Sequence, residues 1–166
     1  MKKIIIALSF ISFAVIMQSQ PIMVNSNTYT NAQLVTDVLI SGCLQAGNVT
    51  YIGDPLSIGY FADPGNNFDF AAGVILSSGY ISDAPGPNNS TGITGNTTGP
   101  SDPLLNAIIP QTTNDAASLE FDFIPSADSL FFRYLFGSDE YPEFVNSSFN
   151  DVFAFFLSGP NPGGGN

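Results

Sequence analysis

Alternating aromatic residues in the last third of this 166-residue chain constrain its fold more than any other feature. In residues 118–123, leucine and phenylalanine alternate with glutamate and aspartate, and residues 129–136 place a leucine and then three aromatic side chains at every second position. A period of two residues is typical of a β-strand with one buried face. Residues 151–157 are apolar on both faces, as in a central strand that is covered on both sides. We therefore expect three successive strands in this part of the chain.

The N-terminus has the pattern of a secretory signal peptide. Two lysines precede an apolar run over residues 4–17, and a short polar stretch follows that run. This order is typical of a signal peptide, and the run is shorter than the roughly 20 residues that a membrane-spanning helix needs. We expect cleavage near Ser19 or Gln20. The sequence then divides into a signal peptide, residues 1–20, and one exported domain, residues 21–166.

The region after this leader adds one helix and several shorter strands. Thr30 and Gln33 fit a capping box, and apolar residues then recur at helical spacing, which predicts a helix over residues 31–41. Runs of β-forming residues bounded by turn residues lie at 48–52, 57–61 and 73–78. The predicted fold class is therefore mainly β: an antiparallel, jelly-roll-like β-sandwich with one short N-terminal helix after the signal peptide.

The charge and the residue types exclude several classes of function. The chain has fourteen acidic residues, three basic residues and no histidine. An acidic surface without a basic patch repels phosphate backbones and anionic lipid, so we expect no nucleic-acid binding. No second apolar stretch reaches spanning length, so we expect no membrane insertion after signal removal. Without histidine, the common general base of hydrolases is missing. Cys43 is the single cysteine, which predicts a fold without internal disulfides and a buried thiol, or a partner thiol outside this sequence.

Polar turn residues cluster at two further places. A set flanking the run at 57–61 combines Asp54, Asp63, Asn66, Asn67 and Asp69, and turn formation explains it better than ligand binding does. Residues 83–103 are rich in glycine, proline, asparagine, serine and threonine, which predicts a long surface loop used for binding or as a flap. At its end, Asp102 and Pro103 fit the N-cap and first position of a short helix.

The densest acidic segment lies between the last two predicted strands. It combines carboxylate and amide side chains that could converge on one cation, and these are Asp139, Glu140, Glu143, Asn150 and Asp151. Oxygen-rich groups suit Ca²⁺, which accepts six to eight oxygen ligands in irregular geometry. Two alternatives stay open. The segment is a solvated acidic loop, or Glu140 and Glu143 are the acid and base of a glycoside hydrolase.

Several motifs together resemble the choice-of-anchor L domain. They are GVILSSG at 73–79, LEFDF at 119–123, FRYLFGSDEYPEFV at 132–145 and FNDVFAFFLSGP at 149–160. The resemblance covers about residues 28–160. It implies an exported bacterial surface protein, of a kind that often carries a C-terminal anchor or a type IX secretion sorting signal. By the same resemblance we expect this domain to be incomplete at its C-terminus, and anchoring would need that further region.

These observations predict a non-enzymatic, secreted or cell-surface module. We expect it to contribute to adhesion or to bind an extracellular glycan or protein ligand, with Ca²⁺ at the acidic segment. The resemblance transfers no catalytic activity and no site residues. An acidic glycoside hydrolase using Glu140 and Glu143, and a purely structural spacer within a larger surface protein, stay open as alternatives.

Overall fold

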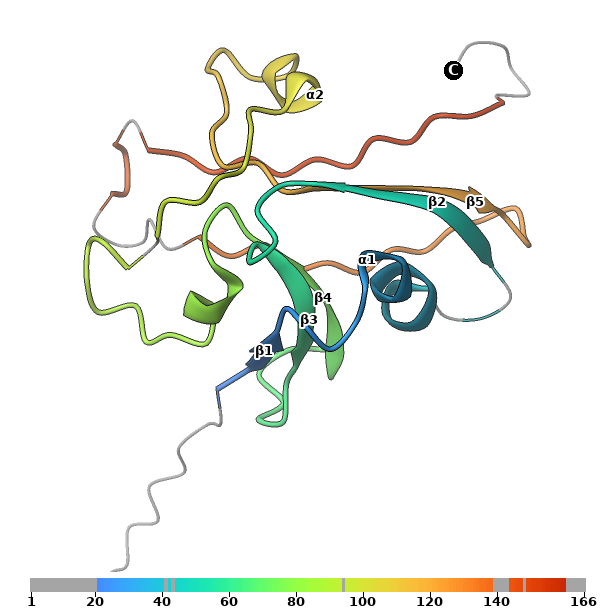
Figure 1. The fold of residues 1–166 in the computed structure, drawn as a ribbon, viewed down its shortest axis with the longest axis horizontal. Coiled ribbons are helices and arrows are strands. Elements are labelled where there is room, and N and C mark those ends of the chain that lie inside the picture. Colours follow the sequence, from blue (N-terminus) through green and yellow to red (C-terminus); the bar gives the residue numbers. More distant parts are fainter. Residues whose placement is uncertain are drawn as a thin grey trace, which may run out of the picture.

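The computed structural model describes residues 21–40, 42, 44–93, 95–138, 144–147 and 149–160. The predicted signal peptide and Cys43 lie outside these residues. Within them, strands form two antiparallel sheets and the helices are short (Figure 1). One sheet has the strand order β1-β3-β4, and the other pairs β2 with β5. A mainly β, antiparallel fold is therefore confirmed, whereas the jelly-roll sandwich stays a prediction.

The three-stranded sheet is built around its middle strand. In it, β3 (Ile58–Ala62) pairs with β1 (Met23–Asn25) on one side and with β4 (Ala72–Leu76) on the other. Phe61 lies opposite Val24 in β1 and opposite a glycine in β4. Because β3 has hydrogen-bonded neighbours on both edges, it is the most buried of the described strands. Its position matches the predicted strand at 57–61.

The two-stranded sheet joins distant parts of the sequence. Here β2 (Gln45–Ile52) runs antiparallel to β5 (Ser118–Ile124), the strand predicted at 118–123. The register shifts between Gly47 and Thr50, and Asn48 between them has a positive φ of 50°. Asparagine tolerates this left-handed conformation better than most residues do, so it fits the irregularity of the strand. The strand begins three residues before the predicted run at 48–52.

The helical segment after β1 departs from a regular α-helix. Thr30 and Gln33 form the capping box: the Thr30 hydroxyl accepts from the Gln33 N–H, and the Gln33 side chain accepts from the Thr30 N–H. One α-helical turn, α1 (Asn31–Gln33), then continues as a π-helix, η1 (Leu34–Leu39). The N–H of Ile40 accordingly bonds five residues back. Helical structure therefore occupies most of the expected range 31–41, but in a wider winding than the spacing predicted.

The connection from β4 to β5 contains two short helices. A 3₁₀-helix, η2 (Ile81–Asp83), follows β4, and α2 (Pro103–Asn106) comes after a long loop. Asp102 caps α2 by accepting from the N–H groups of Leu104 and Leu105, with proline at the first helical position, as predicted. Between the two helices, the described residues form neither helix nor strand.

A small apolar core lies between these elements. Its members come from the π-helix, β3, η2 and the segment before β5, and they are Leu34, Val35, Ile58, Phe61, Ile81 and Ala116. The Phe61 ring packs edge-on against Phe68 and Phe70, in the connection between β3 and β4. The core thus belongs to the region before residue 125.

The prediction of strands at 129–136 and 151–157 is wrong for this structure. Both segments lie within the described residues, and neither pairs with a neighbour in a sheet. The expected central strand carries exposed apolar side chains, with Phe155 54% and Leu157 74% exposed. Alternation marks a segment that is able to form a strand, but a strand also needs a hydrogen-bonded partner, and the period of the sequence does not supply one.

Candidate functional site

The acidic segment predicted to bind calcium is described in part. Asp139, Glu140 and Glu143 lie outside the described residues, whereas Asn150 and Asp151 lie within them and are exposed. The Ser138 hydroxyl donates to the Asp151 carboxylate at 3.0 Å. This contact joins the residues at the two ends of the segment, which are thirteen positions apart. The described residues at the two ends of the segment are therefore held together by side chains.

A tight turn occupies part of this loop. The N–H of Ser147 donates to the carbonyl of Phe144 at 2.9 Å, and Asn146 has a φ of 63°. The Ser147 hydroxyl accepts from the N–H of Phe149, and the rings of Phe144 and Phe149 meet with centroids 5.2 Å apart. Among the residues that the structure describes, no three acidic, histidine or cysteine side chains gather as a metal site.

The second acidic set proves to be made of turn residues, as predicted. Asp63 is only 2% exposed, and its carboxylate accepts from the Asn67 side chain at 2.6 Å and the Phe68 N–H at 2.7 Å. Buried carboxylates are tolerated when hydrogen bonds replace the lost water. Asp63 thereby fixes the turn that follows β3, and it has a structural role.

Asp54 links two parts of the chain that are distant in sequence. One oxygen accepts from the Leu56 N–H at 2.9 Å, and the other accepts from the Thr98 N–H at 3.0 Å and the Thr98 hydroxyl at 2.7 Å. The Leu56 N–H, followed by the two Thr98 donors, holds the pKa of the Asp54 carboxyl below its ordinary value. The sequence identified Asp54 as a turn residue, but it contained no signal for its hydrogen bonds to Thr98, which is 44 positions away.

Tyr51 adds a further contact at this turn. Its hydroxyl donates to the Asp54 carbonyl at 2.8 Å. Burial, followed by the nearby Asp54 charge, raises the pKa of Tyr51 to about 12. Both effects disfavour the phenolate, so the hydroxyl stays a donor well above neutral pH.

The long loop predicted to act in binding or as a flap is attached to the rest of the molecule over its second half. Besides the Thr98 contacts, the Thr97 hydroxyl donates to Asp115 at 2.9 Å, and the Tyr80 hydroxyl donates to the Asn96 carbonyl at 3.1 Å. Asp102 also accepts from the Ser118 hydroxyl, which is the largest influence lowering the pKa of Asp102. These contacts make residues 96–102 part of the scaffold.

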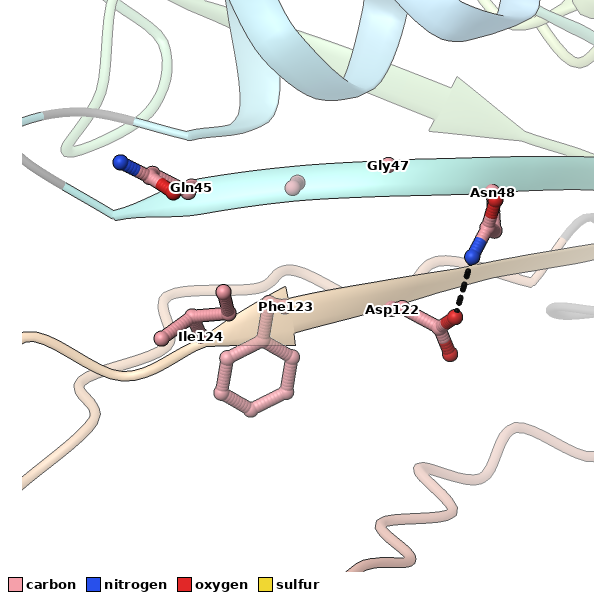
Figure 2. Close-up of a pocket in the computed structure, with 7 residues that line it drawn as sticks. Gln45, Gly47, Asn48, Asp122, Phe123 and Ile124 are labelled. Carbon is pink, nitrogen blue, oxygen red and sulfur yellow. Dashed lines mark hydrogen bonds between the residues drawn. The ribbon is translucent and has the colours of Figure 1, made fainter.

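A hollow lies along the irregular part of the two-stranded sheet (Figure 2). It is lined by Gln45, Ala46, Gly47, Asn48, Asp122, Phe123 and Ile124. The Asn48 side chain donates to Asp122 at 2.7 Å, which ties the two strands together across the register shift. With a single carboxylate in its lining, this hollow lacks the pair of carboxyl groups that a glycoside hydrolase uses.

The unpaired segments bring together a group of rings that sequence reasoning placed in the core. We call it the aromatic seam, and its members are Phe132, Tyr134, Phe136, Phe153 and Phe155. Centroid distances across the two segments are 3.9 Å for Phe132 and Phe155 and 5.2 Å for Tyr134 and Phe153. All five rings are between 42% and 61% exposed. The alternation revealed which rings share a face, but it did not reveal that this face is open.

The fold and these surfaces define a class of protein: a mainly β, acidic module. No helix among the described residues is long and apolar enough to cross a membrane. The family model for the choice-of-anchor L domain matches residues 23–166, and the chain belongs to this family. Neither the curated proteins nor the solved structures contain a match.

Proposed function

We propose that this module acts outside the cell without catalysing a reaction, and that it contributes to adhesion by binding an extracellular ligand with the help of Ca²⁺. Its membership in a surface-associated domain family supports the location. The hydrogen bond between Ser138 and Asp151 carries the assignment of the ligand site to the acidic segment. In this proposal, Asp139, Glu140, Glu143, Asn150 and Asp151 supply the oxygen ligands.

Loop closure supports a cation site in chemical terms. Ser138 and Asp151 meet where the segment begins and ends, and the sequence places Asp139, Glu140 and Glu143 between them. Carboxylates that are close together in sequence repel one another when they are near in space, and a divalent cation relieves that repulsion. The chain offers few cationic side chains for the same task, since it contains three lysines and arginines in total.

A glycan is the ligand class that this chemistry favours. Ca²⁺ accepts oxygen ligands in irregular geometry and keeps positions for water or for hydroxyl groups. Vicinal hydroxyls of a sugar can therefore complete the coordination shell of a cation that protein oxygens fill in part. The site needs no histidine, in agreement with the composition of the chain.

Thermal unfolding with and without Ca²⁺ tests the cation. A ligand at about 100 times its Kd stabilises the native state by about 2.7 kcal/mol, which corresponds to a Tm rise of several degrees. We expect Ca²⁺ to produce such a rise and Asp151→Asn to abolish it. Asp128→Asn, which changes an exposed carboxylate outside the loop, should keep it. An unchanged Tm for the wild-type chain at millimolar Ca²⁺ would refute the cation site.

A glycan array read with Ca²⁺ and with chelator tests the ligand. We expect retention of the wild-type chain on some glycans with Ca²⁺, and its loss with chelator and in Asp151→Asn. Release of reducing sugar, abolished by Glu140→Gln or Glu143→Gln, would instead establish the hydrolase. Absence of both retention and turnover would leave the spacer role.

A further inference from the structure

We draw no further inference here: the strongest candidate, the exposed apolar face that the aromatic seam forms within residues 130–157, carries no proposal because nothing in the structure shows what covers it.

Discussion

Two regions of this molecule use apolar residues in opposite ways. In residues 23–124, a few side chains from separate elements are buried together, as with Leu34 at 1% exposed and Ile58 at 3%. In residues 130–157, a denser run of aromatic side chains lies open to solvent. The first region differs in having strands paired on their edges and polar anchors between loops. Apolar content alone therefore does not determine burial, because a strand is buried only where neighbours pair with it and cover it.

The largest test of this contrast replaces one phenylalanine in each region with alanine. Phe61 is 7% exposed and packs against two further rings, so Phe61→Ala should lower the free energy of unfolding by about 3–5 kcal/mol. Phe131 is 92% exposed, so Phe131→Ala should change it by less than about 0.5 kcal/mol. Urea unfolding of both variants measures the difference. Comparable losses of unfolding free energy in the two variants would mean that the second region is packed as tightly as the first.

An intermediate effect is expected at the Asp54 anchor. Asp54→Asn replaces an oxygen that accepts two hydrogen bonds from Thr98 with an amide group that donates, so the variant should melt below the wild-type chain at neutral pH. Because folding lowers the pKa of Asp54, the stabilisation by the carboxylate is complete above its unfolded pKa near 3.8 and is lost as the pH falls through the folded pKa.

Melting temperatures between pH 6 and pH 2.5 measure this linkage, because that range spans the unfolded pKa of 3.8. We expect the difference in melting temperature between the wild type and Asp54→Asn to be constant in the upper part of this pH range and to become smaller in the acid part. Asp128→Asn, at an exposed carboxyl between the two regions, is the control and should melt with the wild-type chain at neutral pH. A difference in melting temperature that stays the same at acid pH would show that the charge of Asp54 contributes nothing to stability.

The smallest expected effect concerns the capping box before the π-helix. Thr30→Ala removes the side-chain acceptor of the Gln33 N–H and should cost about 1 kcal/mol. Thr30→Ser keeps a hydroxyl at the same place and should restore most of the loss. In the second region, Ser138→Ala removes an exposed side-chain contact and should cost less in the absence of Ca²⁺. Chemical denaturation measures the free energy of unfolding of the three variants. A greater loss of unfolding free energy in Ser138→Ala than in Thr30→Ala would show that the second region contributes more to stability than the first.

Local signals predicted much of the first region. The capping box at Thr30, the proline start of α2 and the turn at Asp63 all depend on contacts within a few residues, and the sequence displays them. The strands from β2 to β5 were found for the same reason, since β-forming runs bounded by turn residues and, for β5, a period of two are local properties. The π-helical winding was not found, because the wider turn is a choice between two helices with similar sequence patterns.

The sequence by itself determined the strand-forming pattern, the turns, the caps and the acidic character of this protein. Only the tertiary structure decided which strand-forming segments have partners, that Asp54 bonds to Thr98, and that the aromatic seam is open. Periodicity and capping follow from contacts between residues that are close together in the chain, so they can be predicted from the sequence. Pairing and burial depend on residues that are far apart in sequence, and a side chain's exposure is fixed only when every segment that could cover it has been placed in space.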